Sequence, residues 1–140
     1  MFICQKVLCA CPTVSSRSVH DFGNRLRYIG NCPFRKISKK NYTHRVFTEE
    51  ERRQSEGRLS RLAGDFSVKE AVSKCFGTGV RNFSLMDIEV LRDSLGKPYV
   101  KLYGGAEKIF LEMGGKALHV SISNTKDLVM AYAVLEGEGF

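Results

Sequence analysis

Glu70 and Lys74 are the residues whose types and spacing most directly suggest chemistry, and they lie within the sequence FSVKEAVSKCFGTG, residues 66–79. When successive residues are placed about 100° apart, as in a helix, Glu70 lies on the same stripe as Leu62 and Phe66. A carboxylate on an apolar stripe must be paired, bound to a metal ion or protonated, because an unpaired buried charge is unfavourable.

Two interpretations of this carboxylate remain open from the residues alone. Glu70 and Lys74 have the favourable order for an ion pair across one helical turn. Alternatively, Glu70 is a ligand of a hard cation, because Mg²⁺ is usually held by one or two carboxylates together with phosphate oxygens of the substrate. Lys74 would then contact a phosphate as a point charge.

The segment that positions these residues is expected to be the second of two consecutive helices. Thr48 is a good N-cap for the first helix, and Glu51, three residues later, completes a capping box. Gly57 is expected to end this helix. The second helix is predicted from about residue 59 to residue 76, with Gly77 as its C-cap.

Alternating patterns follow this helix and predict antiparallel strands. A short helix closed by glycines is expected at residues 106–115. The expected strands are 87–93, 98–104, 117–124 and 128–138. Helices early in the chain and antiparallel strands late indicate an α+β fold, with helices packed on an antiparallel sheet.

Positive charge is concentrated in the first third of the chain. The net charge is +7, and residues 1–47 contain nine lysines and arginines but one acidic residue. This excess favours nucleic acid, an anionic membrane surface or an acidic protein as the partner, although a solvated basic helix at residues 34–40 would produce the same pattern. No apolar run approaches the roughly 18 residues of a membrane helix. Five cysteines, an odd number, favour reduced thiols and a cytoplasmic location.

Residues 1–20 show no helix or strand period, and residues 1–28 are predicted to be an atypical or disordered N-terminal extension outside the fold. Their scarcity of acids, with some serine and arginine, is typical of an organelle-targeting segment. An upstream extension that results from an incorrectly assigned translation start would have a similar composition. The length of 140 residues predicts one domain, here expected at residues 29–140.

Five segments, in their order and spacing, resemble the holo-acyl-carrier-protein synthase family of small 4′-phosphopantetheinyl transferases. The resemblance covers residues 46–136 closely and residues 29–45 loosely. Its most specific part is the pattern F-x-x-K-E-A-x-x-K-x-x-G-T-G. The segments are VFTEEE (46–51), RLAGDFSVKEAVSKCFGTGV (61–80), DIEV (87–90), GKPYVKL (96–102) and HVSIS (119–123).

The resemblance implies a 4′-phosphopantetheinyl transferase-like fold and a homotrimer with active sites between subunits. The family transfers 4′-phosphopantetheine from coenzyme A to a serine of apo-acyl carrier protein, in fatty-acid biosynthesis. It also implies Mg²⁺ as a cofactor that bridges a pair of carboxylates to the coenzyme A pyrophosphate. Glu70 matches one carboxylate of that pair, and Lys74 matches the lysine near the phosphates, so both are expected to be catalytic.

Further positions match the binding surfaces of the family. The segments that line its coenzyme A cleft match Gly77, Thr78, Lys97, Pro98, Asn124 and Thr125. Its first-helix region, which receives the acidic recognition helix of the carrier protein, matches Arg35, Lys36, Lys39, Lys40 and Arg45. Composition and resemblance therefore both predict an acidic protein partner.

One departure from the family concerns the second metal carboxylate. Family members begin with a strand of the form G-x-D-x-x-E, but here Cys32 follows residues 29–31 where the aspartate should stand. Asp21 is a poor substitute, because VHDFGN lacks the strand motif. The alternative to an active transferase is therefore an impaired homologue that only binds carrier protein or coenzyme A. Two smaller departures are Asp65, where arginine is usual, and Asn124, where histidine is frequent.

A third hypothesis is nucleic-acid binding by the basic first third of the chain. Aromatic residues that could stack on bases are interleaved there, namely Tyr28, Phe34, Tyr42 and Phe47. The transferase is favoured over this hypothesis, so neither nucleic acid nor membrane is expected as a partner.

Overall fold

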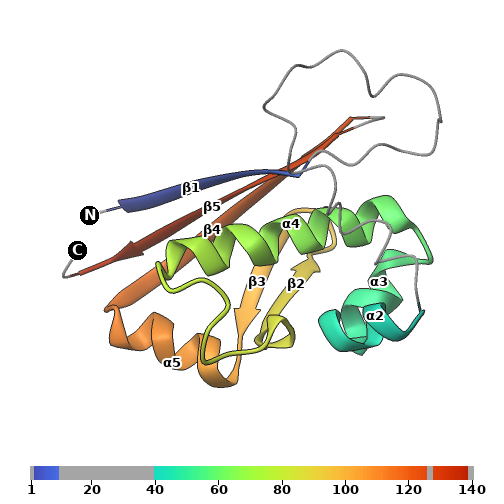
Figure 1. Ribbon diagram of the computed structural model, residues 1–140. Coiled ribbons are helices and arrows are strands. Elements are labelled where there is room, and N and C mark those ends of the chain that lie inside the picture. The colour runs from blue at the N-terminus through green and yellow to red at the C-terminus, as the bar shows by residue number, and fades with distance from the viewer. Residues whose placement is uncertain (1, 10–39, 126–127, 139–140) are drawn as a thin grey trace, which may run out of the picture.

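The computed structural model of this chain describes residues 2–9, 40–125 and 128–138 (Figure 1). In chain order, its elements are β1 (Phe2–Cys9), α2 (Lys40–Val46), α3 (Glu49–Ser55), α4 (Leu59–Cys75), a 3₁₀ helix (Leu85–Asp87), β2 (Ile88–Arg92), β3 (Pro98–Leu102), α5 (Gly104–Glu112), β4 (Gly115–Asn124) and β5 (Val129–Gly137). None of the helices in these ranges is both long and apolar enough to cross a membrane.

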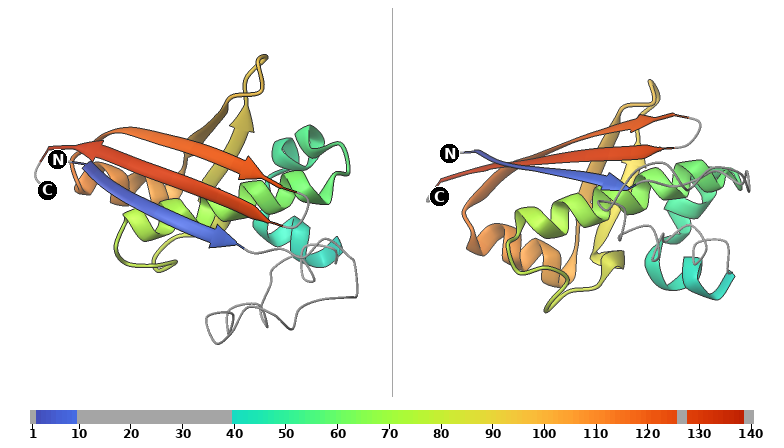
Figure 2. Two further views of the ribbon diagram at one scale, coloured as in Figure 1. Left: turned by 90° about the horizontal axis from the view of Figure 1, so that it is seen from above. Right: turned by 45° about the horizontal axis from the view of Figure 1, so that its top comes forward.

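Antiparallel pairing joins the described strands into two sheets. The larger sheet has the order β1-β5-β4, and Ser121 of β4 lies opposite Tyr132 of β5. In the smaller sheet β2 pairs with β3, with Val90 opposite Val100. Helix α4 lies between the two sheets (Figures 1 and 2). The α+β fold predicted from the sequence, with helices packed on antiparallel strands, is confirmed.

The main hydrophobic core lies on both sides of α4. Its buried residues come from α4, β2, α5 and β5 and include Val68, Ala71, Val72, Cys75, Ile88, Val90, Ala106, Ala131, Ala133 and Leu135. Because two layers cover it, α4 is buried around most of its circumference. Its polar residues Asp65, Ser67, Lys69 and Ser73 are buried as well.

The apolar stripe predicted on α4 is only one of its buried faces. Leu62 and Phe66 on that stripe pack with Val46 and Phe47 in a second, smaller cluster at the junction of α2 and α3. Glu70 follows one turn later and is half-buried. The stripe therefore packs beside α2, while other faces of α4 contact the sheets.

The junction between α3 and α4 confirms the predicted helix break. Thr48 and Glu51 form the expected capping box, in which the Thr48 N–H donates to Glu51 Oε2 at 2.7 Å and the Glu51 N–H donates to Thr48 Oγ1 at 3.2 Å. Glu56 and Gly57 have φ angles of 52° and 74°, in the left-handed region, which ends α3. Helix α4 then ends before the left-handed Gly77, as predicted.

Three expectations differ from the structure. Residues 2–9, which the sequence patterns left outside the fold, form β1 beside β5; this pairing is a contact with a distant segment that a local pattern does not contain. Of the helix expected at residues 34–40, the structure describes Lys40, which begins α2. Helix α5 begins at Gly104 and β4 at Gly115, each two residues earlier than expected.

Candidate active site

Glu70 is half-buried on α4, one turn beyond Phe66. Burial raises the pKa of its carboxyl group, and the charge of Lys74 acts in the opposite direction. Among the described residues no ion pair includes Glu70, so the proposed pair with Lys74 is not formed. Burial and the charge of Glu70 together raise the pKa of Tyr42, which places this α2 side chain near the carboxylate.

Lys74 and the GTG turn follow Glu70 at the C-terminal end of α4. Lys74 is exposed in the last helical turn, and its carbonyl oxygen accepts the Gly77 N–H at 3.0 Å. Gly77 and Gly79 have φ angles of 72° and 63°, which glycine adopts without strain. Thr78 between them is exposed. These predicted residues therefore do lie together at one end of the helix.

Lys69, the residue before Glu70, is fully buried and fixes this part of α4. Its Nζ lies 2.9 Å from the Glu51 carboxylate and also donates to the carbonyl oxygens of Leu85, at 2.9 Å, and Ile88. Burial lowers the pKa of Lys69 and raises that of Glu51, while their mutual attraction opposes both shifts. Sequence patterns did not identify this pair, because lysine is almost never fully buried.

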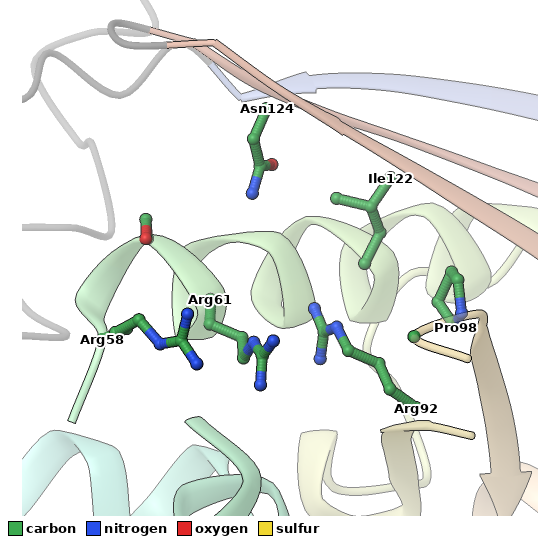
Figure 3. Close-up of a pocket in the computed structure, with 8 residues that line it drawn as sticks. Arg58, Arg61, Arg92, Pro98, Ile122 and Asn124 are labelled. Carbon is green, nitrogen blue, oxygen red and sulfur yellow. The ribbon is translucent and has the colours of Figure 1, made fainter. Parts of the chain in front are cut away.

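A second group of candidate residues surrounds a cavity of about 330 Å³ near the start of α4, here named the arginine cavity. Its lining residues are Arg58, Ser60, Arg61, Arg92, Gly96, Pro98, Ile122 and Asn124. Figure 3 shows the guanidinium groups of the three arginines beside the same stretch of α4, with Ile122 and Asn124 extending toward it from β4. Pro98 and Asn124, both predicted to bind coenzyme A, thus share one cavity with three arginines.

The three arginines differ in how their charges are balanced. Arg58 pairs with Glu56 at the exposed surface. Arg61 donates from Nη1 to a backbone carbonyl oxygen at 2.7 Å and has no acidic partner within the described ranges. Arg92 Nη1 lies 2.8 Å from Asp65 Oδ1 in the interior. Guanidinium groups are well suited to phosphate oxygens, so this cavity fits a phosphorylated ligand.

Sequence patterns do not single out these arginines, for two different reasons. Arg58 and Arg61 are three residues apart at the start of α4 and are therefore neighbours on the helix. This spacing is visible in the sequence and could have indicated a basic site. Arg92 lies at the end of β2, and nothing in its local sequence relates it to the other two. Their meeting depends on how β2 packs against α4.

The remaining coenzyme A candidates lie outside this cavity. Lys97 is exposed in the turn between β2 and β3, and Thr125 is in the turn after β4, where its N–H donates to the Leu128 carbonyl oxygen at 2.8 Å. The GTG turn lies toward the opposite end of α4. A helix rises about 1.5 Å per residue, so Arg61 and Glu70 are separated by about 13 Å along its axis. Within one copy of the chain, the two groups therefore lie at different levels along α4.

The predicted carrier-protein docking face is described only from α2 onward. Arg45 is exposed in the last turn of α2, and Lys40 is the first residue of this helix. The other docking candidates, Arg35, Lys36 and Lys39, lie outside the described residues, as do the weak carboxylate candidate Asp21 and Cys32, which stands where the family has its aspartate.

The aromatic residues of the nucleic-acid hypothesis belong to the protein interior wherever they are described. Phe47 is fully buried, and Tyr42 packs against the cluster that contains it. Tyr28 and Phe34 lie outside the described residues. Base stacking requires open ring faces, so Tyr42 and Phe47 do not support this hypothesis.

Glu70 is the candidate carboxylate for Mg²⁺ in the described part of the chain. No group of three or more His, Cys, Asp and Glu side chains in that part could hold a metal ion. Strand β1 has the sequence FICQKVLC, without an acidic residue. A single carboxylate without an ion-pair partner fits Mg²⁺ when phosphate oxygens and water supply the other ligands.

Known proteins resemble this chain in sequence over most of its length. The family model of the 4′-phosphopantetheinyl transferase superfamily matches residues 31–133. Over 98 residues, the chain is 48% identical to the holo-[acyl-carrier-protein] synthase of Lachnoclostridium phytofermentans, with 70% of this chain and 80% of that protein covered.

Solved structures agree with these sequence similarities. The holo-[acyl-carrier-protein] synthase from Neisseria meningitidis has a TM-score of 0.70 and 26% identity, covering 95% of this chain and 96% of that one. The Bacillus anthracis synthase, in complex with CoA (3′,5′-ADP), has a TM-score of 0.65 and 27% identity, covering 96% of each chain. Fold and sequence similarity lead to one conclusion: the chain belongs to the 4′-phosphopantetheinyl transferase superfamily.

Proposed function

We propose that this chain transfers the 4′-phosphopantetheine group of coenzyme A to a serine hydroxyl of apo-acyl carrier protein. The serine oxygen forms a bond to the β-phosphorus of coenzyme A, the phosphoanhydride bond breaks, and adenosine 3′,5′-bisphosphate leaves while the hydroxyl proton is released. Two observations on relatives support this proposal. The relative of 48% identity is named for this activity, and the Bacillus anthracis structure contains the coenzyme A ligand.

The half-buried Glu70, which has no ion-pair partner in the described part of the chain, is the observation that most directly supports the proposal. Phosphoryl transfer depends mainly on positioning and on neutralisation of charge. Mg²⁺ held by Glu70 would supply charge neutralisation at the pyrophosphate. Lys74, exposed one turn later, would contact a phosphate oxygen, and the buried Lys69 keeps both residues in place.

The arginine cavity is the proposed site for the phosphorylated adenosine part of coenzyme A. Pro98 and Asn124 form part of its wall, and Lys97 lies beside it. In a homotrimer, the cavity of one copy would lie against Glu70, Lys74 and the GTG turn of the next copy. Such an assembly would bring together two groups that lie at different levels along α4 within one copy.

The remaining parts of the proposal concern partners and organisation. The carrier protein, which is acidic, would dock on α2 and the basic segment before it, and Arg45 is exposed there. We assign the transferase domain to residues 29–140, supported by the family match from residue 31, with β1 added to its larger sheet by pairing with β5. A cytoplasmic role in fatty-acid biosynthesis, with Mg²⁺ as cofactor and without nucleic acid, completes the proposal.

Intact-mass spectrometry of the carrier protein tests this function. Apo-acyl carrier protein is incubated with the purified chain, coenzyme A and Mg²⁺, with and without EDTA. We expect the carrier protein to gain one phosphopantetheine, and EDTA to abolish the gain. The same carrier protein, modified normally by an established synthase but not by this chain, would overturn the proposal.

A second candidate function is binding without catalysis, and the absence of an acidic residue from β1 favours it. Such a protein would bind coenzyme A or apo-acyl carrier protein in isothermal titration calorimetry but would form no product in the mass assay. Binding and product together would exclude it.

A further inference from the structure

We propose that Asp65 positions the Arg92 guanidinium at the wall of the arginine cavity and acts as its proton-controlled counterion, which weakens the binding of coenzyme A phosphates when Asp65 is ionised. This inference rests on the proposed function, because it assumes that the cavity receives those phosphates. Asp65 does not line the cavity itself and acts through Arg92.

The route of the Arg92 side chain across α4 is the first observation behind this proposal. Arg92 extends from β2, and its Nη1 reaches Asp65 Oδ1 at 2.8 Å. A Cβ atom added at Gly64 would lie 3.7 Å from Arg92 Nη2 and 3.2 Å from Ile122 Cγ2. Glycine is unfavourable within a helix by about 0.5–1 kcal/mol relative to alanine. At Gly64 it leaves room for Ile122 against the helix, and the Arg92 guanidinium passes this position at ordinary van der Waals distance.

The second observation is that the Asp65 carboxylate is buried with too few partners. Asp65 is 1% exposed and Arg92 12% exposed. Although Nη1 and Oδ1 are close, neither Asp65 oxygen nor Arg92 Nη1 has a well-aligned hydrogen bond among the described residues. The contact is therefore an attraction of charges, and it only partly offsets the removal of a carboxylate from water.

Burial of Asp65 brings its titration into the neutral range. Burial raises the pKa of Asp65 to about 7, and Glu51 of α3 adds to the rise. Arg92 of β2 and Lys69 of α4 act in the opposite direction. The carboxyl group is thus neutral below about pH 7 and negatively charged above it.

The charge of Asp65 decides how much of the Arg92 charge acts on a ligand. With Asp65 neutral, Arg92 faces the cavity as an uncompensated cation beside Arg58 and Arg61. With Asp65 ionised, its negative charge lies directly behind the guanidinium and also repels a bound phosphate. A unit charge several ångströms from a ligand phosphate changes binding by about tenfold in a medium of intermediate dielectric constant.

Isothermal titration calorimetry with adenosine 3′,5′-bisphosphate tests the inference on the full chain. Wild type, Asp65→Asn and the exposed control Glu107→Gln are compared from about pH 6 to about pH 8.5, the range around the proposed titration. The ligand phosphates also change protonation over this range, but this change affects the binding to all three proteins equally. We expect Asp65→Asn to match wild type at the acid end and to bind about tenfold more tightly at the alkaline end, with Glu107→Gln following wild type.

Arg92→Gln keeps the inference testable should Asp65→Asn fail to fold. This variant should bind more weakly than wild type at the acid end, with a smaller loss of affinity toward alkaline pH. Parallel pH profiles for wild type and either variant would overturn the inference while leaving the proposed function intact. An absence of binding to wild type would overturn the inference and the assignment of the cavity to coenzyme A phosphates, whereas the transfer activity itself stands or falls with the mass assay.

Discussion

The Lys69 ammonium and the Glu51 carboxylate lie 2.9 Å apart in the interior, both fully buried, and join α4 to α3 one residue before Glu70. Glu51 also accepts the backbone N–H of Val90 at 2.8 Å and that of Thr48 at 2.7 Å. Every strong partner of Lys69 is an oxygen acceptor, which favours the charged ammonium despite its burial. The pair thus holds α3, α4 and β2 together around Glu70, the residue proposed to bind the metal.

Removing the ammonium should strongly destabilise the fold. Lys69→Met leaves the buried Glu51 without its cation, a change that typically lowers the free energy of unfolding by about 3–5 kcal/mol. Adding Glu51→Gln should recover part of this loss, because the amide keeps an acceptor for the Val90 N–H without a charge. Urea denaturation of both single variants and the double variant measures the coupling free energy between Lys69 and Glu51. Lys108→Met, which breaks an exposed pair with Glu112, should change stability by less than about 1 kcal/mol.

Replacing the candidate metal ligand should abolish transfer without unfolding the protein. Glu70→Gln keeps the size of the side chain but removes the charge, and we expect product formation to fall by about a hundredfold or more. Thermal stability should be unchanged or slightly higher, because a half-buried carboxylate without an ion-pair partner is replaced by a neutral amide. The mass assay and thermal unfolding measure the two effects, with exposed Glu107→Gln as the control. Full activity in Glu70→Gln would exclude Glu70 from the mechanism.

Two inactive variants should restore each other if copies share the site. Glu70→Gln removes the proposed metal ligand, and Arg61→Glu reverses a charge in the arginine cavity. In a randomly mixed cyclic trimer, about one quarter of the sites would combine an intact Glu70 from one copy with an intact cavity from its neighbour. Activity after joint refolding, with the mass measured by light scattering, provides the readout. A trimer without recovered activity would show that each copy builds its own site.

Reversing the charge of Arg45 should weaken carrier-protein recognition specifically. We expect Arg45→Glu to raise the KM for apo-acyl carrier protein about three- to tenfold at low salt, because charges at the rim of an interface act mainly on the association rate. The KM for coenzyme A should stay unchanged. Because the Debye length shortens with ionic strength, the difference from wild type should shrink as salt is added. Lys108→Glu on α5 is the matched control, and an equal effect there would argue against a docking face on α2.

Asp65 should make the stability of the protein depend on pH. Its folded pKa of about 7 lies above the value near 4 expected for an unfolded aspartate. Since the protonated form is favoured in the folded state, this stabilising contribution is complete below about pH 4 and is lost as the pH rises through about 7. The free energy of unfolding of wild type should therefore fall across this range relative to Asp65→Asn. Denaturation curves at several pH values measure this difference, and a constant difference would contradict the shift.

Local patterns predicted the elements well because their signals are local. The capping box at Thr48 and Glu51, the break at Gly57 and the glycine end of α4 each depend on a few adjacent residues, and each is confirmed. Glu70 and Lys74 were selected for the same reason, since their spacing on one helix can be read directly from the sequence.

The missed features depend on contacts between distant segments. Asp65 and Lys69 are buried because α4 is covered from both sides, and a one-sided apolar stripe does not predict that. The arginine cavity combines residues from the start of α4, the β2–β3 region and β4. The partner of Arg92 is 27 positions away in the chain, so only the packing of β2 on α4 reveals their pairing.

Strand β1 also has an expected consequence for the protein in solution. It covers one edge of β5, the central strand of its sheet, along Val129–Gly137. That strand has the sequence VMAYAVLEG, with one charged residue and no proline to discourage pairing. A chain shortened to residues 29–140 would expose this edge to other molecules, and exposed apolar edge strands are templates for aggregation. The segment that the sequence patterns left outside the fold would then determine whether the protein remains in solution at working concentrations.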